Sequence, residues 1–162
     1  MLRWIVVADA SNARIFSTLD GRTLKLITQL NHPSSRLRAQ SIDSDRPGRL
    51  SKGKNSHIRS AMESANGTHR LQIEQFAHQI GLYLQAAFDQ HDFQALAVVA
   101  PPRFLGLIRA QLEAHGIPYF HHGITRECVK TPVQDLLETL KTDLAEWFRE
   151  SPAPIHVRAQ LT

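Results

Sequence analysis

One segment of the chain concentrates the residue types that bind phosphate. Residues 44–56, SDRPGRLSKGKNS, carry two arginines and two lysines, separated by proline and glycine. A guanidinium presents a planar fork of donors that fits a phosphate group, and glycine lets the backbone approach a ligand closely. The pattern favours contact with an acidic polymer such as RNA. The residues expected to make or shape this contact are Arg46, Pro47, Gly48, Arg49, Lys52 and Lys54, with Arg59 and Arg103 as outer candidates.

The net positive charge of the chain is confined to the same region. Residues 33–66 hold seven Lys or Arg residues against three acidic ones, a balance of +4, and the whole chain is also +4, so the remainder sums to zero. Such confinement indicates a local anion-binding patch rather than a generally basic protein. No aromatic residue lies within it, so we expect contacts to the phosphate backbone rather than base stacking. The alternative is a solvated insertion without a binding role.

Carboxylates raise a second hypothesis, metal-dependent nucleic-acid cleavage. A two-metal nuclease site needs several carboxylates around ions that lie about 3.5–4 Å apart. Asp9 follows the first apolar run, and Glu74 lies in a long amphipathic stretch. The later strand ends in VVAPP and offers no further acid. A turn-forming role for Asp9 is the preferred interpretation. We therefore assign no catalytic residue, no metal and no cofactor, although enzymatic activity stays open.

The remaining candidates are weaker. The pair His121-His122 points to opposite faces of a regular strand and cannot bind one ion together, which favours packed or surface histidines. Cys128, the single cysteine, excludes an internal disulfide and is expected to be a small packed residue. Arg103 would lie in the first turn of a helix after a strand, a common location for anions. The alternative is that the neighbouring prolines simply start that helix.

Periodicity predicts the elements that position these residues. Apolar runs and alternation indicate strands at 4–8, 13–19 and 24–30, with a hairpin turn at Asp20-Gly21. No regular period follows from His32 to Gly67. An amphipathic helix is then expected at 69–90 with Thr68 as its N-cap. Beyond it we expect a strand at 95–100, a helix from Pro101-Pro102 to Gly116, a strand at 117–124 and a helix after the capping box TPVQ at 131–134.

This order defines the fold class. Three antiparallel strands, a long basic loop at 33–67, and then alternating helix and strand (βββ-loop-αβαβα) predict a single α/β domain over residues 1–150, with a ribonuclease-H-like mixed sheet. Residues 151–162 are expected to be a C-terminal tail. A chain of 162 residues can bury about 70% of its unfolded surface. The apolar runs are too short for a signal peptide or a membrane span, so a cytoplasmic location without membrane contact is expected.

Three motifs together resemble the bacterial host attachment protein family. They are WIVVADASNARIF at 4–16, SDRPGR at 44–49 and VAPPRFLGLIR at 99–109, and the likeness covers about residues 3–148. Members of that family are described as required for attachment to host cells. The resemblance also implies a relationship to the central domain of archaeo-eukaryotic peptide-chain release factors, whose corresponding loop carries Gly-Gly-Gln. The loop in this sequence has Arg46-Pro47-Gly48-Arg49 instead and contains no Gly-Gly-Gln.

The function predicted from these observations is a non-catalytic RNA- or ribosome-associated domain. Its partner would be the ribosome or a structured RNA, contacted through the basic loop, and its oligomeric state is left open between monomer and homodimer. The alternative is a host-attachment interaction protein with no role in nucleic-acid binding. A metal-dependent nuclease is the third and least favoured interpretation.

Overall fold

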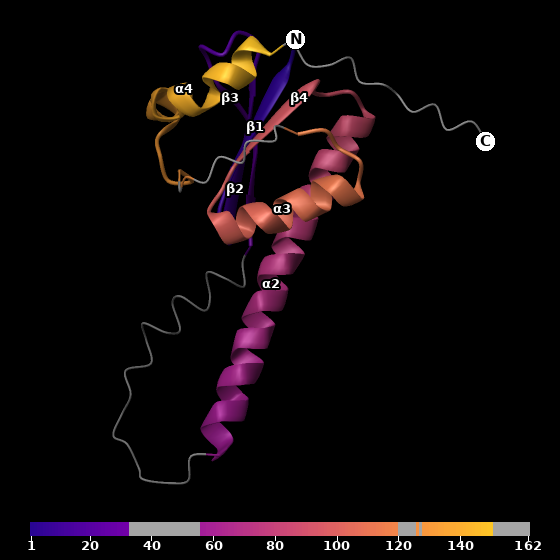
Figure 1. The fold of residues 1–162 in the computed structure, drawn as a ribbon, viewed down its shortest axis with the longest axis vertical. Coiled ribbons are helices and arrows are strands. Elements are labelled where there is room, and N and C mark those ends of the chain that lie inside the picture. The colour runs from indigo at the N-terminus through magenta and orange to yellow at the C-terminus, as the bar shows by residue number, and fades with distance from the viewer. Residues whose placement is uncertain (33–55, 120–125, 127, 151–162) are drawn as a thin grey trace, which may run out of the picture.

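The computed structural model describes residues 1–32, 56–119, 126 and 128–150, with side chains described outside 56–66. Its elements alternate as the sequence predicts, three strands first and then helices around one further strand (Figure 1). The bounds are β1 Arg3–Ala8, β2 Asn12–Thr18, β3 Lys25–Asn31, α2 Ser56–Asp89, β4 Ala95–Val99, α3 Pro102–Ala114 and α4 Val133–Arg149.

The four described strands form one mixed sheet in the order β3-β2-β1-β4. β2 is antiparallel to both β1 and β3, whereas β1 and β4 are parallel. The mixed α/β sheet is thus confirmed. All six side chains of β1 are buried, because a strand in the middle of a sheet with helices on both faces meets no water. The ribonuclease-H-like assignment includes a fifth strand at 117–124 and stays a prediction.

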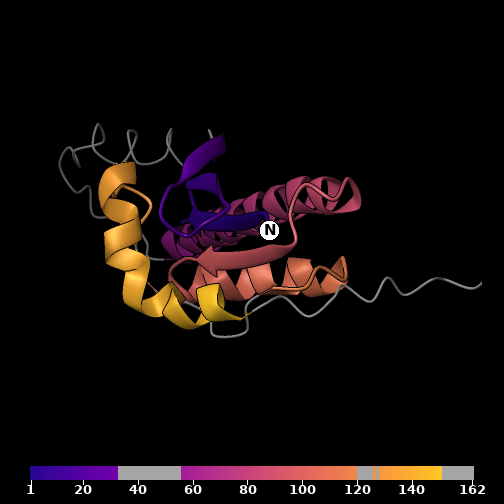
Figure 2. The ribbon, with the colours of Figure 1, turned by 90° about the horizontal axis from the view of Figure 1, so that it is seen from above.

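Two separate cores cover the two faces of the sheet. On one face, alternate residues of β1, β2 and β4 pack against α2 and α3, around Phe76, Ile80 and Ile108. On the other face, the intervening residues pack against α4, around Leu136, Leu140 and Leu144. In the view of Figure 2, α4 lies on the opposite side of the strands from α2. Strand alternation therefore assigns each core residue to one layer of helices.

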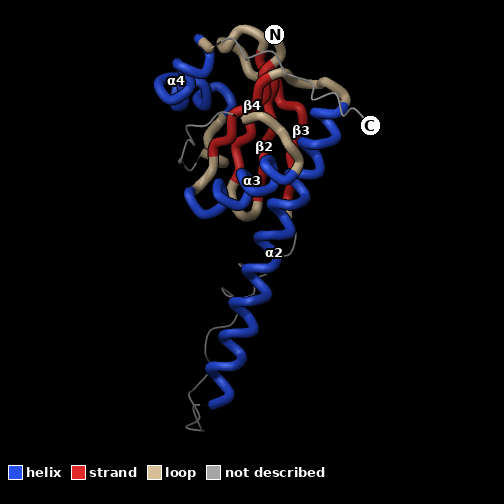
Figure 3. Tube along the Cα trace, turned by 45° about the vertical axis from the view of Figure 1, so that its right-hand side comes forward, coloured by secondary structure: helices blue, strands red, loops and turns tan. Residues whose placement is uncertain are grey.

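Helix α2 is much longer than the sequence predicts. It begins at Ser56 rather than near Thr68, so the expected loop at 33–67 is helical over its last twelve positions. The prediction failed because Ser, Asn and Gly in 56–67 have low helix propensity and show no apolar stripe. Thirty-four residues give a helix of about 50 Å. Figures 1 and 3 show that its N-terminal half extends well beyond the sheet and α3.

The predicted ends of α3 are confirmed. Pro102 occupies the first turn after Pro101, where a missing N–H costs nothing. At the other end, Gly116 has φ +65° and donates its N–H to the carbonyl of Glu113 (3.1 Å), while the Ile117 N–H reaches the carbonyl of Leu112 (2.9 Å). This pair of bonds is a Schellman motif, which a residue without Cβ accommodates best.

One other prediction needs correction. Thr131 does not cap α4, because the N-cap is Pro132, whose carbonyl accepts the N–H groups of Asp135 and Leu136 (3.0 Å each). The Thr131 N–H instead donates to the carbonyl of Cys128 (3.0 Å), in a turn before the helix. The predicted strand at 117–124 begins with three residues, 117–119, that have no strand pairing, and its other residues lie outside the described part of the chain. Within that part, no helix has the length and apolar character required to cross a membrane.

Two glycines of α2 offer a matched test of its packing. A Cβ on Gly81 would lie 2.8 Å from the Cβ of Gln111 on α3, whereas a Cβ on Gly67 would meet nothing within 4 Å. We expect Gly81→Ala to lower the free energy of unfolding by about 1–2 kcal/mol, since the overlap with Gln111 outweighs the gain in helix propensity. Gly67→Ala should raise it by about 0.5–1 kcal/mol. Urea denaturation of both variants measures the difference, and equal shifts would contradict the close approach of α2 and α3.

Candidate nucleic-acid interface

The predicted phosphate-binding residues fall in three places. Arg46, Pro47, Gly48, Arg49, Lys52 and Lys54 lie outside the described residues, between the end of β3 and the start of α2. Arg59 lies in the first turns of α2, in the part whose side chains are not described. Arg103 lies exposed in the first turn of α3. The described part of the structure therefore shows the elements that flank the basic segment, residues 33–66, and not the phosphate-binding residues 46–54 within it.

The start of the basic segment is fixed to the core. At the end of β3, the His32 N–H donates to the carbonyl of Ser11 (2.9 Å), and the His32 ring stacks on Phe76 of α2 with centroids 5.6 Å apart. Phe76 is fully buried and also packs against Phe104 of α3, 5.8 Å away. One aromatic contact thus joins the chain entering the segment to the helix leaving it. Residues 67–71 of that helix, before the packed region, are exposed.

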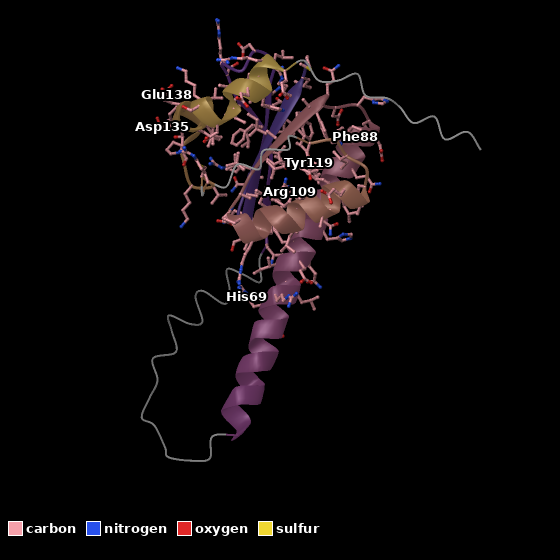
Figure 4. The ribbon with its side chains drawn as sticks, in the orientation of Figure 1. His69, Phe88, Arg109, Tyr119, Asp135 and Glu138 are labelled. Atoms are coloured by element: carbon pink, nitrogen blue, oxygen red, sulfur yellow. The ribbon has the colours of Figure 1, made fainter. Side chains whose placement is uncertain are left out.

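Helix α2 carries its exposed charges on the side away from the core. His69 lies below the crossing with α3 (Figure 4). The Nε of the next residue, Arg70, is 3.2 Å from the Glu74 Oε1. Because both partners are substantially exposed, this pair contributes little to stability. Higher on the same helix, the His78 Nδ1 lies 3.0 Å from the Gln111 Oε1 of α3. Polar side chains thus occur along α2 between His69 and His78.

The two carboxylates of the nuclease hypothesis have other partners. The Asp9 Oδ1 accepts the backbone N–H groups of Ser11 (2.8 Å) and Asn12 (2.7 Å), which is the turn-forming role that the sequence favours. Glu74 faces Arg70 on the outside of α2. Within residues 1–32, 56–119, 126 and 128–150, no three His, Cys, Asp or Glu side chains are grouped to hold a metal ion. His121 and His122 lie outside the described residues.

Cys128 is a packed residue, as predicted. It is 4% exposed and belongs to the core under α4, and burial raises the pKa of its thiol. Its carbonyl and that of Thr131 accept bonds from one terminal nitrogen of Arg14, at 3.1 and 2.7 Å. The Arg14 guanidinium also lies over the Phe16 ring (5.4 Å), and burial lowers the pKa of Arg14. Arg14 thereby fixes the turn before α4 to β2.

Sequence reasoning did not single out the arginines that hold α4 and the end of α3. Arg3 is buried and binds backbone carbonyls at the end of α4. Arg109 of α3 lies beside Tyr119 (Figure 4), with its guanidinium 5.7 Å from the ring centroid, and the Tyr119 hydroxyl donates to the Glu113 carboxylate (2.7 Å). Arg109 and Glu113 are four residues apart on a helix, and this spacing was the feature of the sequence that could have indicated their proximity. For Arg3, which directly precedes the predicted strand at 4–8, and Arg14, within the predicted strand at 13–19, the signal was only that each interrupts an apolar run.

The comparisons with known proteins decide the family. The profile described as "Protein required for attachment to host cells" matches residues 4–140. The chain belongs to this family. A comparison with curated proteins finds no match. Among solved structures, this family member is similar to the archaeal translation termination factor aRF1 (12% identity, TM-score 0.40) and to a structure titled only as an archaeal protein (12%, 0.39). Each likeness covers 91% of this chain but only 40% and 38% of the other, so the chain spans well under half the length of either.

Proposed function

We propose that this protein is a non-catalytic module that contacts the phosphates of a structured RNA, with the ribosome as the leading candidate, and works in the cytoplasm. Contact is made by the basic segment, residues 33–66. Arg46, Arg49, Lys52 and Lys54 bind phosphates, Pro47 and Gly48 shape the backbone between them, and Arg59 and Arg103 add outer contacts. The single observation that carries the proposal is the confinement of the entire net charge, +4, to this segment.

The arrangement of the described residues supports the proposal in two ways. First, α2 begins at Ser56, inside the basic segment, and its N-terminal half stands clear of the sheet (Figure 3). A nucleic acid could therefore approach that end without contacting the neutral body of the protein. Second, the stacking of the His32 ring on Phe76 fixes the start of the segment to the core. This limits the conformational entropy that the segment loses when it binds.

A salt titration tests the proposal. Binding of the full chain to purified ribosomes and to a structured RNA is measured between 25 and about 300 mM salt, because each phosphate contact contributes about 0.7–0.9 to the log–log slope. Replacing Arg46, Arg49, Lys52 and Lys54 by alanine should weaken binding about 10-fold or more at low salt and reduce the slope by about 3.

A matched control separates the segment from net charge. Alanine at Arg22, Lys130, Lys141 and Arg149 removes the same four charges from exposed positions elsewhere and should change the slope by less than about 1. Equal losses in both variants would mean that only overall charge matters. Unchanged affinity and slope in the first variant would refute the proposed contact.

A second candidate function follows from the family itself. Membership in a family described as required for attachment to host cells favours an interaction protein with no role in nucleic-acid binding. The two functions predict different locations, so fractionation of cells that make the native protein distinguishes them. Co-sedimentation with ribosomes in a salt-sensitive manner supports RNA contact. Recovery at the cell surface supports attachment.

A further inference from the structure

Within the part of the chain that the structure describes, no strand pairs with the outer edge of β3. β3 is the terminal strand in the order β3-β2-β1-β4, and most of its side chains are exposed. Leu26 is 47% exposed and Ile27 38%. In a terminal strand, the N–H and C=O groups that point away from the sheet lack strand partners, and natural proteins usually protect such an edge. The only charged residue in β3 is Lys25, so the strand sequence itself offers little protection.

The register shows which side of the sheet this edge leaves open. Leu26 stands opposite Phe16, which belongs to the core under α4. Residues that stand directly opposite each other in a sheet share a face, so Leu26 lies on the α4 side. Leu24 packs against the same core, yet Leu26 extends beyond its cover. Ile27 is the extra residue at the irregularity between Ile15 and Phe16. The core on the α4 side therefore does not extend over Leu26 of β3.

The end of helix α4 lies close to the start of β3. A terminal nitrogen of Arg3 donates to the carbonyls of Phe148 (3.2 Å) and Glu150 (3.1 Å), which fixes the end of the helix beside the first residue of β1. The Phe148 ring lies against Gly21 in the β2–β3 turn, where a Cβ would be only 2.9 Å from the Phe148 Cδ1. The described chain therefore reaches residue 150 close to the turn that leads into β3.

The sequence after α4 has the pattern of a strand. Residues 155–162 read IHVRAQLT, in which an apolar residue alternates strictly with a polar one. This period of two is typical of a strand with one buried face. The intervening SPAP, residues 151–154, can span at most about 13 Å. We propose that residues 155–161 add to the free edge of β3 in the same chain, parallel to it. The apolar residues that would cover Leu26 on the α4 side are Ile155, Val157, Ala159 and Leu161.

Both the direction of the segment and the choice of edge follow from the sheet. Arg3 stands opposite Thr18, and Ser17 stands opposite Lys25, so the point where α4 ends lies at the same end of the sheet as the start of β3. A segment that starts at this end of the sheet and pairs with β3 must run parallel to it. The opposite edge strand, β4, is a poorer partner, because its residues are already buried in the two cores. Four added apolar side chains would find uncovered apolar surface at β3, and not at β4.

Cysteine pairs in the full chain test the proposal. In a Cys128→Ala background, Leu26→Cys is combined in turn with cysteine at each position from 155 to 161, and disulfide formation is followed under a mild oxidant. Neighbouring strands lie about 4.8 Å apart, within the range that a disulfide spans. We expect cross-linking within one chain at the odd-numbered positions nearest Leu26, about 10-fold faster than at the even-numbered positions between them.

Hydrogen exchange gives an independent readout that needs no cysteine. Val157→Asp should make the β3 amides exchange about 10-fold faster, whereas Gln160→Asp, which adds the same charge on the opposite face, should leave them as in the unmodified chain; the amides of β1 serve as the internal reference in both. Equal cross-linking at odd and even positions would overturn the proposal, as would β3 exchange that neither substitution changes. Cross-links that join two chains would also overturn it, because the occupant would then be a second copy.

Discussion

Replacing Phe76 by alanine is expected to lower the free energy of unfolding by about 3–5 kcal/mol. Phe76 is fully buried, and its ring contacts both His32 and Phe104, at 5.6 and 5.8 Å between centroids. Alanine would leave a cavity among α2, α3 and the end of β3, because a helix packed on two sides cannot collapse to fill it. If the protein remains folded, α2 and the start of the basic segment should also lose their fixed relation to the sheet.

Leu82 provides the control on the same helix. It is 47% exposed, so Leu82→Ala should change stability by less than about 0.5 kcal/mol. Chemical denaturation of both variants gives the free energies, and hydrogen exchange of residues 72–84 reports whether α2 detaches locally. A loss below about 1 kcal/mol for Phe76→Ala would show that the contact between His32, Phe76 and Phe104 does not hold the helix.

The second large effect is expected at Arg3. Arg3→Ala should lower the free energy of unfolding by about 2–4 kcal/mol, since it removes two charge-assisted bonds to carbonyls at the end of α4 and leaves those acceptors without their partner. The guanidinium also lies 5.7 and 5.5 Å from the ring centroids of Trp147 and Phe148, so part of the loss is packing against aromatic faces. A cation at a helix C-terminus is further favoured by the helix dipole.

Two substitutions distinguish these contributions. Arg3→Lys keeps the charge but loses the planar fork, so we expect about half of the loss. Arg22→Ala removes an exposed arginine and should be nearly neutral. The measurement is urea denaturation together with hydrogen exchange of the last turn of α4. If Arg3→Ala destabilises the protein while the last turn of α4 stays protected, the arginine stabilises β1 rather than the helix end.

Elements whose signals are local were predicted well from the sequence. The run Trp4–Ala8 and the alternation after Asn12 led to β1 and β2 within about one residue, because their burial depends on the pattern of two that the sequence displays. The ends of α3 were equally accessible, since Pro102 and Gly116 act through the backbone geometry of their own position. The role of Asp9 was also readable, because it accepts bonds from residues two and three positions later.

Features that depend on distant partners were not accessible in the same way. No nearby signal shows that Arg3 meets residues 145 and 147 positions later, or that Arg14 holds the turn before α4. The start of α2 was missed because Gly67 and its polar neighbours give no apolar period. Of the predicted site, the structure places Arg59 on α2 and Arg103 at the start of α3, and the other six residues lie outside its described part.

The parallel pairing of β1 with β4 has a consequence for how the chain is made. β1 and β2 are neighbours in sequence and can associate early, but Arg3 meets Ala95 only after more than ninety residues have been synthesised. Until then, β1, whose residues are all buried in the folded protein, has one side without a partner. Contacts at such separation form slowly, and an unpaired apolar edge is prone to aggregation. The nascent chain thus passes through a vulnerable stage that ends when β4 emerges.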